Sequence, residues 1–329
     1  MFWNGKKVLV TGGAGFIGSH LSESLLASGA EVTIFTRYSS NGIQGALLDV
    51  PPETFARLRI VAGDLRDASG VDQAVAGQDV VFHLAAHIGI PYSYVHPNDV
   101  VQVNMNGTAN VLEACRRHGT ARLVSFSTSE VYGTAQYVPI DEAHPLHPQS
   151  PYAATKVGAD QLCLSYHRSF GLPVTVCRPF NTYGPRQPPR AVLPTIISQA
   201  LAGDEIRLGS LTPRRDLVYV GDTVSGAMAL AQCDAALGEV VNLATGSDVA
   251  VGDLAETVIR LLGGGKRIVT DSARIRPAAS EVMQLLGGAE KARALTGWTA
   301  ATTLDDGLGR TIEWVRRNPQ IFKDLSYRI

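Results

Sequence analysis

The stretch "KKVLVTGGAGFIGSHLSESLLASGAEVTIF" (residues 6–35) decides the fold class of this chain. Its first five residues are a short apolar run typical of a buried strand, and "EVTIF" at residues 31–35 is another. The residues between them turn through glycines and then follow the spacing of an amphipathic helix that ends at Gly29. A strand, a glycine-rich turn, a helix and a second strand predict the first unit of an α/β protein.

The same alternation continues along the chain to about residue 180. Further apolar runs are "RLRIVAGD" (57–64), "DVVFHLA" (79–85), "ARLVSFS" (121–127) and "LPVTVCRP" (172–179), with helical patterns at 98–118 and 151–170. This alternation predicts a Rossmann-type, doubly wound parallel sheet covered by helices on both faces. We expect a dinucleotide-binding domain at 1–180 and a smaller, mainly substrate-binding domain at 181–329, with a strand near 239–245 that returns to the main sheet.

Composition narrows the classes of partner. The 329 residues carry a net charge of −1, with 45% apolar and 18% charged residues, which is the balance of an ordinary globular protein. This charge gives no reason to expect a nucleic acid or an anionic membrane as partner. The four cysteines stand far apart without C-x-x-C spacing, so we expect core thiols and no metal site. No apolar run has the length of a signal peptide or membrane span, and we therefore expect a cytoplasmic protein.

The glycine-rich turn "TGGAGFIG" (residues 11–18) predicts the first binding site. Gly12 allows a tight turn, Gly15 allows a pyrophosphate to approach the backbone, and Gly18 lets the helix pack on the sheet. The start of the helix offers unpaired N–H groups to the anion. Glycines at such a turn can also serve packing alone, but the flanking strand and helix favour a dinucleotide cofactor.

The end of the second expected strand bears on the choice of cofactor. An acidic residue there would accept the ribose 2′-hydroxyl of NAD, but this chain has "FTRYSS" (35–40) with Arg37 and Ser39. Arg37 can pair with a 2′-phosphate, so NADP is favoured and NAD remains an alternative. A solvated loop residue is the alternative role for Arg37. Asp64 is expected to face the adenine edge, although an Asp after a strand is also a common helix cap.

The segment "SPYAATK" (150–156) contains a pair typical of proton transfer. Tyr152 and Lys156 stand at i and i+4 and therefore lie on one face of a helix. A tyrosine with a pKa near ~10 is a poor base at neutral pH, but a neighbouring ammonium favours the phenolate by roughly 1–3 pKa units. The pair can then take a proton from a substrate hydroxyl while a nicotinamide takes the hydride. A surface packing pair is the alternative for an isolated Tyr and Lys at this spacing.

Several ordered motifs together resemble the extended short-chain dehydrogenases that act on nucleotide sugars. They are "TGGAGFIG", "HLAA", "STSEVYG", "SPYAATK", "RPFNTYGPR" and, later, "RDLVYVGDT". Within this family, "HIGIPYSY" and "SEVYGTAQYVPIDE" look closest to sugar-nucleotide 4,6-dehydratases of the legionaminic acid pathway. "TRYSS" is similar to the "RRSS" of GDP-mannose 4,6-dehydratases, a likeness that also favours NADP.

The resemblance implies the roles of individual residues. Thr128, Tyr152 and Lys156 match the hydroxyl–tyrosine–lysine catalytic set, and Glu130 falls where dehydratases hold the base that acts at C5. The neighbouring acid is often Asp, but here the position holds Ser129, as in the GDP-mannose enzymes. The implied cofactor contacts are Gly12, Gly15, Phe16, Ile17, Gly18, Arg37, Ser39, Asp64, Leu65, Leu84, Ala85, Ala86, Tyr152 and Lys156. The implied contacts to the nucleotide-diphosphate sugar are His87, Asn181, Arg186, Arg190, Arg215 and Arg276. A homodimer without a metal is expected.

Glu130 separates the candidate reactions. A 4-epimerase needs only the hydroxyl, the tyrosine and the lysine, whereas a carboxylate beside them implies a further proton transfer once C4 is a ketone. This favours a 4,6-dehydratase that makes an NDP-4-keto-6-deoxyhexose in a redox-neutral cycle. A 4-epimerase and a UDP-glucuronic acid decarboxylase remain alternatives, as does Glu130 as a turn acceptor. A catalytically dead, cofactor-sensing regulator is a more distant alternative.

Overall fold

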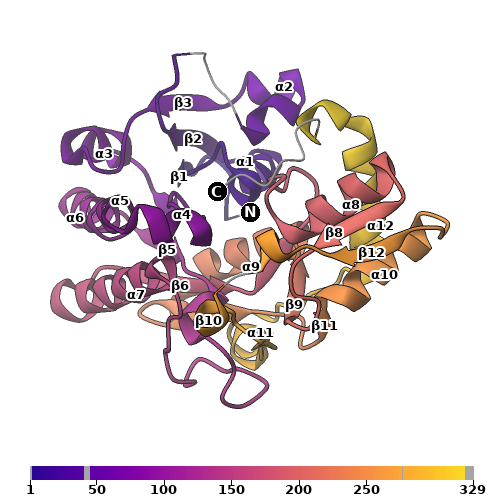
Figure 1. Ribbon diagram of the computed structural model, residues 1–329. Helices are drawn as coiled ribbons and strands as arrows, with labels where there is room; N and C mark the ends of the chain where they lie inside the picture. The colour runs from indigo at the N-terminus through magenta and orange to yellow at the C-terminus, as the bar shows by residue number, and fades with distance from the viewer. Residues whose placement is uncertain (1, 41–44, 276, 323–329) are drawn as a thin grey trace.

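The computed structural model describes residues 2–40, 45–275 and 277–322. Its centre is a parallel sheet of seven strands in the order β10-β6-β5-β4-β1-β2-β3 (Figure 1). The strands are β1 (Lys7–Thr11), β2 (Glu31–Thr36), β3 (Arg59–Ala62), β4 (Val80–His83), β5 (Arg122–Phe126), β6 (Val174–Pro179) and β10 (Val240–Leu243). The predicted doubly wound α/β fold is therefore confirmed.

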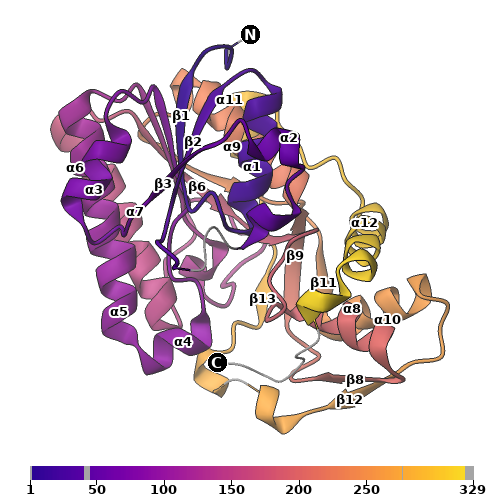
Figure 2. The same cartoon turned by 90° about the horizontal axis from the view of Figure 1, so that it is seen from above.

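Helices cover both faces of this sheet because alternate strand residues point to opposite sides. Val8 and Val10 of β1 pack in one cluster with α1 (Phe16–Ala27) and α9 (Val220–Gln232). Leu9 between them packs in a second cluster on the other face. The helices of that face are α3 (Ala68–Val75), α6 (Gly107–His118) and α7 (Pro151–Phe170). Figure 2 shows the two helical layers on either side of the strands.

Short helical elements connect the larger ones. In the first half of the chain they are η1 (Ala46–Asp49), α2 (Pro52–Phe55), α4 (Ile90–Val95), α5 (Pro97–Val101), a π-helix η2 (Gln102–Asn106) and a 3₁₀-helix η3 (Ser129–Tyr132). In the second half they are η4 (Asp234–Ala236), η5 (Ser272–Arg274), η6 (Ala278–Ser280), α11 (Glu290–Thr296) and η7 (Pro319–Phe322). Both α5 and α6 adjoin η2, so residues 97–118 run as one nearly continuous helical segment, close to the helix predicted at 98–118.

A second group of elements lies beside the main sheet (Figure 2). Its strands are β7 (Asn181–Tyr183), β8 (Glu205–Leu208), β9 (Arg214–Tyr219), β11 (Asp248–Ala250), β12 (Arg267–Thr270) and β13 (Gln284–Leu285). Strand β9 pairs with β7, β11 and β13, and β8 pairs with β12. Helices α8 (Val192–Ala202), α10 (Val251–Leu261) and α12 (Leu304–Arg317) contribute to the separate hydrophobic core of this group.

The chain crosses between the two groups more than once. Strand β10 corresponds to the strand expected near 239–245, and it pairs in parallel with β6 through Val240 and Val176 at the edge of the main sheet. Sequence reasoning did not anticipate that α9 also packs on the main sheet, beside α1. Residues after 181 therefore supply a strand and a helix to the dinucleotide-binding fold.

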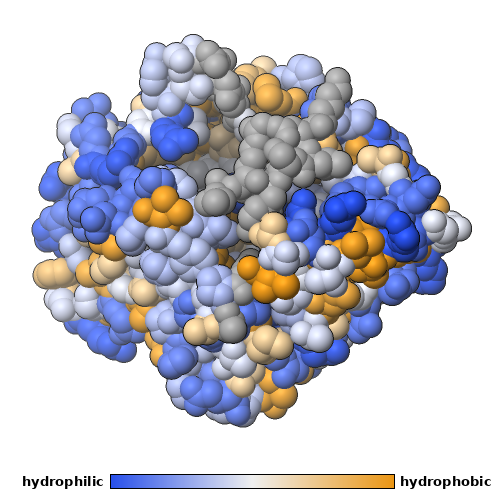
Figure 3. Space-filling view, in the orientation of Figure 1, coloured by the Kyte–Doolittle hydropathy of each residue, from blue (hydrophilic) through white to orange (hydrophobic). Residues whose placement is uncertain are grey.

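The surface mixes polar and apolar residues. In the view of Figure 3, hydrophilic residues surround separate apolar patches. Across the described ranges, no helix combines the length and apolar character that crossing a lipid bilayer requires. Cys115, Cys163 and Cys177 are buried free thiols and Cys233 is half-buried, as expected for core cysteines.

Candidate active site

The predicted motifs meet at the carboxyl edge of the main sheet. Strands β5, β4 and β1 are neighbours, and they end at Phe126, His83 and Thr11. The segments that follow these strands carry the hydroxyl and carboxylate motif, the "HLAA" residues and the glycine-rich turn. In open parallel sheets, ligands bind in the crevice at this edge.

The glycine-rich turn has the geometry that a pyrophosphate site requires. Gly12 has a φ of 73°, and a Cβ placed on it would lie 2.8 Å from the backbone nitrogen of Ala85. A Cβ on Gly18 would lie 2.8 Å from the Cα of Gly13 and would also collide with the Gly12 carbonyl. Gly15 caps helix α1 without any side-chain hydrogen bond, so the first N–H groups of α1, from Phe16 and Ile17 onward, remain for an anion. The turn therefore fits a dinucleotide.

A buried histidine that the sequence analysis did not select links this turn to its neighbours. His83 Nδ1 lies 2.8 Å from Thr11 Oγ1, and its Nε2 lies 3.0 Å from Thr108 Oγ1 on α6. The N–H of Ala85 donates to Thr11 Oγ1 at 3.2 Å. Burial lowers the pKa of His83 to about 3, and the charge of Lys156 acts in the same direction. His83 is therefore a neutral bridge that fixes the ends of β1 and β4.

The side chains expected around the adenosine lie at the ends of β2 and β3. Arg37 is exposed and Ser39 is half-buried. Asp64 accepts hydrogen bonds from Arg66 through Nε at 2.9 Å and Nη2 at 2.6 Å. These contacts hold the pKa of Asp64 below its ordinary value, and the nearby charge of Arg37 contributes. Leu65 is buried, whereas the predicted Leu84, Ala85 and Ala86 are half-buried after β4.

The turn after β5 brings together the proposed acid, base and hydroxyl groups. Thr128 caps η3, and its Oγ1 accepts the N–H of Glu130 at 3.2 Å. Ser129 is buried and Glu130 is half-buried. Tyr152 lies in the first turn of α7 and is 7% exposed, and its hydroxyl is close enough to Thr128 for that side chain to lower the Tyr152 pKa. Helix α7 begins there because Ser150 caps it by accepting the Ala153 N–H and Pro151 takes its first position.

The pKa of Tyr152 differs from the sequence-based expectation that the ammonium of Lys156 would lower it. Burial raises the pKa of Tyr152, the nearby Thr128 side chain opposes this, and the nearby Glu130 carboxylate raises the pKa further. Lys156 is buried, and its Nζ donates to the carbonyl of Phe126 at 2.6 Å. Burial lowers the pKa of Lys156, whereas Asp160 raises it. The expected depression of the Tyr152 pKa is not found in the chain alone, because burial dominates.

Two of the predicted substrate contacts, His87 and Asn181, lie in segments next to the glycine-rich turn and the turn after β5, and both carry polar groups that can hydrogen-bond a ligand. His87 pairs with Asp99 at 3.0 Å, and its N–H donates to Asn104 Oδ1 at 2.7 Å, so its position is well defined. Asn181 begins β7, and its buried Oδ1 has no hydrogen-bond partner among the described residues. A buried acceptor without a partner is typical of a site that contacts a ligand or water.

The predicted arginines are divided between different environments. Arg186, with a φ of 69°, pairs with Glu23 of α1 and donates to the carbonyl of Asp49 at 3.2 Å. Arg190 is exposed. Arg215 lies 3.4 Å from Glu281, a carboxylate that the sequence analysis did not single out. Arg276 lies outside the described residues. The structure thus brings Arg186 against α1 and Arg215 against Glu281.

The other missed residues form a buried ion pair behind the turn. Asp160 Oδ2 accepts from Arg178 Nη2 at 2.9 Å, and both side chains are at most 3% exposed. Two signals in the sequence could have found them: Asp160 follows Lys156 by one helical turn, and Arg178 interrupts the apolar run of β6.

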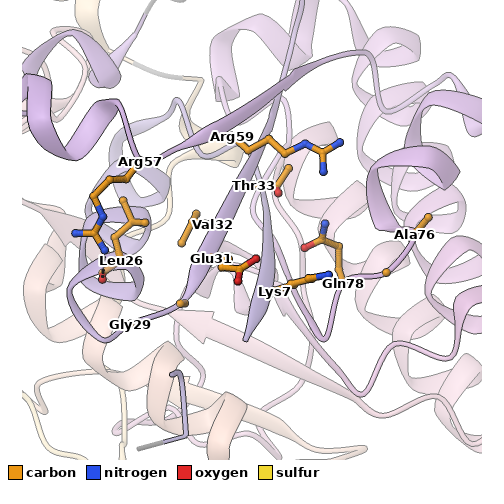
Figure 4. A pocket seen from close by; sticks show the side chains of 12 residues that line it. Lys7, Leu26, Gly29, Glu31, Val32, Thr33, Arg57, Arg59, Ala76 and Gln78 are labelled. Carbon is orange, nitrogen blue, oxygen red and sulfur yellow. Dashed lines mark hydrogen bonds between the residues drawn. The ribbon is translucent and has the colours of Figure 1, made fainter. Parts of the chain in front are cut away.

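A cavity of ≈ 600 Å³ lies at the opposite, amino edge of the sheet (Figure 4). Its lining includes Lys7, Glu31, Arg57, Arg59 and Gln78 but none of the predicted site residues. The candidate active site is therefore the carboxyl edge.

Comparisons with known proteins show the family to which the chain belongs. Residues 9–311 match the family described as GDP-mannose 4,6 dehydratase. The chain is 34% identical over 327 residues to a dTDP-glucose 4,6-dehydratase from Streptomyces niveus, covering 97% of this chain and 96% of the relative. The chain therefore belongs to this family, within the extended short-chain dehydrogenases that comprise sugar-nucleotide dehydratases and epimerases.

Two solved structures extend the comparison. A dTDP-glucose 4,6-dehydratase from Streptomyces venezuelae with NAD bound has a TM-score of 0.85 and 32% identity, covering 97% of this chain and 99% of that one. A UDP-N-acetylglucosamine 4-epimerase from Methanobrevibacter ruminantium in complex with UDP-N-acetylmuramic acid has a TM-score of 0.86 and 28% identity, covering 96% and 99%. The predicted family of NAD(P)-dependent sugar-nucleotide enzymes is confirmed, whereas the likeness to the legionaminic acid pathway stays a prediction.

Proposed function

We propose that this protein is a nucleotide-sugar 4,6-dehydratase that converts an NDP-hexose to an NDP-4-keto-6-deoxyhexose. The observation that carries the proposal is the grouping of Thr128, Glu130 and Tyr152. Thr128 and the Glu130 carboxylate both lie close enough to Tyr152 to act on its pKa, which Thr128 lowers and Glu130 raises. A second acid–base group beside the hydroxyl–tyrosine pair is what dehydration at C5 and C6 needs and simple oxidation at C4 does not.

The chain supplies groups for each proton transfer. Tyr152 takes the proton of the C4 hydroxyl, while Thr128 hydrogen-bonds the same oxygen and Lys156 supplies positive charge. The turn of Gly12, Gly15 and Gly18 would hold NAD(P), which when bound would supply a hydride acceptor for C4 and afterwards a hydride donor for C6. Once C4 is a ketone, Glu130 removes the acidified C5 proton, and the C6 hydroxyl leaves as water. Glu130, directly or through Ser129 or water, protonates that leaving group. A solvent-derived proton adds at C5 when C6 is reduced, which completes the 4-keto-6-deoxy sugar.

Binding of the sugar nucleotide is assigned to the elements at the edge of this site. Asn181, with its unpartnered Oδ1, and Arg215 are the proposed contacts to the diphosphate, and His87 is the proposed contact to the sugar. An arginine suits a diphosphate because its planar fork donates two parallel hydrogen bonds. Arg190 and Arg276 remain proposed contacts, whereas the ion pair with Glu23 favours a role for Arg186 in holding the loop after β7 on α1.

Cofactor preference is a finer proposal. We propose NADP over NAD because Arg37 is an exposed cation at the end of β2, where an NAD-binding domain usually has an acid. The NAD found in the Streptomyces venezuelae dehydratase and the proximity of Arg37 to Asp64 weigh toward NAD. Mass spectrometry of the nucleotide released by denatured protein decides between the two.

Product analysis tests the proposed reaction. Purified protein is incubated with UDP-, GDP-, dTDP- and CDP-hexoses in deuterated water without added reductant. We expect one product that lacks one water and carries solvent deuterium at C5. Loss of carbon dioxide would identify a decarboxylase, and an unchanged mass with inverted C4 would identify an epimerase. Nucleotide binding without any turnover would favour a regulator. Size-exclusion chromatography tests the predicted homodimer.

A further inference from the structure

The Asp160–Arg178 ion pair is buried behind the turn of residues 127–132, called here the catalytic turn. Neither residue takes part in the proton transfers described above. Two charges in a protein interior cost folding free energy, and well-packed apolar residues of similar volume are often as stable or more so. A buried pair of this kind is therefore weak evidence for a purely stabilising role. Its contacts point to what it holds.

One end of the pair holds the start of the catalytic turn. Ser127 immediately precedes Thr128, and its Oγ donates to Asp160 Oδ2 at 2.8 Å. Arg178 Nε donates to the same oxygen at 3.0 Å. The carboxylate thus joins helix α7, strand β6 and the first residue after β5 at one point.

The other end holds the close of the same turn. Arg178 Nη1 donates to the hydroxyl of Tyr132, the last residue of η3, at 3.0 Å. That hydroxyl donates to Asn242 Oδ1 of β10 at 2.7 Å, and Asn242 Nδ2 donates to the carbonyl of Ile140 at 3.2 Å. Tyr132 is fully buried. The three residues Thr128, Ser129 and Glu130 therefore lie between two side chains that hydrogen-bond to a single ion pair.

We propose that Asp160 and Arg178 are positioning residues that clamp the turn 127–132 at both ends and set Thr128 and Glu130 against Tyr152. This inference rests on the proposed function, since it assigns those residues to proton transfer. The clamp also reaches Lys156, which precedes Asp160 by one turn of α7. Because β10 supplies Asn242, a strand from the second half of the chain completes the support of the site.

The negative charge of Asp160 also acts on the pKa values of the proposed proton-transfer groups. Asp160 raises the pKa values of both Tyr152 and Lys156, although burial is the largest influence on each. The charged or titratable groups that face this region are Lys156 and Cys163 on α7, Arg178 and Cys177 on β6, Tyr132 and Glu130 on η3, and His83 on β4. Removing the Asp160 charge takes away the buried carboxylate that acts on Lys156 and pairs with Arg178.

The first experiment separates positioning from stability. The double variant Asp160→Leu/Arg178→Met replaces the pair with apolar side chains, and Leu164→Ala, one turn further along α7, is the control for core destabilisation. We expect the double variant to keep a melting temperature near that of the parent but to lose on the order of 10²-fold in kcat, as expected for misplaced groups. If the double variant keeps both the kcat and the melting temperature of the parent, the proposal is overturned, because a purely structural pair predicts that result.

Milder variants keep the proposal testable if the double variant does not fold. Ser127→Ala and Tyr132→Phe each remove one end of the clamp and leave both charges in place. Hydrogen–deuterium exchange of the peptide that covers residues 127–133 should rise in both variants and stay at the parental level in Leu164→Ala. This readout requires no turnover. Unchanged exchange in both clamp variants would contradict the proposal even if the parent proves to have a different activity.

The pH profile of the first oxidation separates charge from geometry. Activity needs Tyr152 deprotonated and Lys156 protonated, so the acid and alkaline limbs follow their two pKa values. Asp160→Asn lowers both pKa values, and the whole profile should move to lower pH by roughly one unit. Ser127→Ala and Tyr132→Phe should lower kcat without this shift. A parent that never reduces its cofactor with any sugar nucleotide refutes the proposed function, while an unshifted profile in Asp160→Asn refutes the charge role.

Discussion

The two edges of the central sheet carry polar residues under opposite conditions. At the amino edge, Lys7, Glu31, Arg57 and Arg59 line a cavity but are exposed to solvent (Figure 4). At the carboxyl edge, Lys156, Asp160 and Arg178 are buried; Lys156 donates to the Phe126 carbonyl, and Arg178 donates to Asp160. Solvated surface charges cost little, whereas buried ones require a partner for every charge. Burying charges at the carboxyl edge therefore lowers the stability of the fold there. The perturbed pKa values lie at the same edge, as is typical of a functional site.

The largest effect is expected from Tyr152→Phe at the carboxyl edge. The variant loses the phenolic hydroxyl next to Thr128 that is proposed to take the C4 hydroxyl proton, and kcat should fall by about 10²–10⁴-fold. Binding of the sugar nucleotide should persist, as calorimetry can measure. A kcat within a few-fold of the parent would remove Tyr152 from the reaction.

Next in size is Glu130→Gln. The amide cannot remove the C5 proton, so dehydration should slow on the order of 10²-fold while oxidation at C4 continues. The expected result is reduced cofactor and 4-keto sugar trapped together, which absorbance and mass spectrometry detect. Dehydration at the parental rate would leave Glu130 as a turn residue only.

A third test compares two helical glycines. In Gly18→Ala the new Cβ would press on the glycine-rich turn, and overpacking of this kind costs about 1–3 kcal/mol. Gly309→Ala is the matched control, because Gly309 is exposed in α12 with open space around it, and Ala should stabilise the helix by about 1 kcal/mol. Thermal unfolding should shift in opposite directions, and only Gly18→Ala should weaken cofactor binding. Equal cofactor affinity in both variants would contradict a close approach at this turn.

A smaller change is expected from Arg37→Asp. Replacing the guanidinium with a carboxylate should move the ratio of NADP to NAD affinity toward NAD by roughly tenfold, or ~1.4 kcal/mol. Titration of the apoprotein with each nucleotide measures this ratio. If Arg37→Ala leaves NADP affinity unchanged, Arg37 is a solvated loop residue.

The smallest effect is expected at the amino edge. Arg59→Ala removes an exposed charge beside the cavity, so the free energy of unfolding should change by no more than about 0.5 kcal/mol and kcat should not change. A loss of activity in this variant would show that the amino edge communicates with the site, against the contrast drawn above.

Much of the fold was readable from the sequence because its signals are local. The glycine-rich turn predicted β1, α1 and β2 through a few neighbouring residues, and the spacing of Tyr152 and Lys156 predicted one shared helix face. Distant partners were not readable in this way. Arg186 was expected at the substrate, but the structure pairs it with Glu23, which lies far away in the sequence. The packing of α9 on the main sheet was not predicted, for the same reason.

The sequence by itself determined the alternation of strands and helices up to about residue 180, the turn that fits a dinucleotide and the residue types of the site, since each depends on backbone conformation or on periodicity over one or two turns. Only the tertiary structure decided how the site is supported. The clamp joins Ser127, Tyr132, Asp160, Arg178 and Asn242, which come from five elements or the segments beside them. Burial sets the electrostatics of such groups, and burial depends on every element packed around them, so no local pattern reveals it.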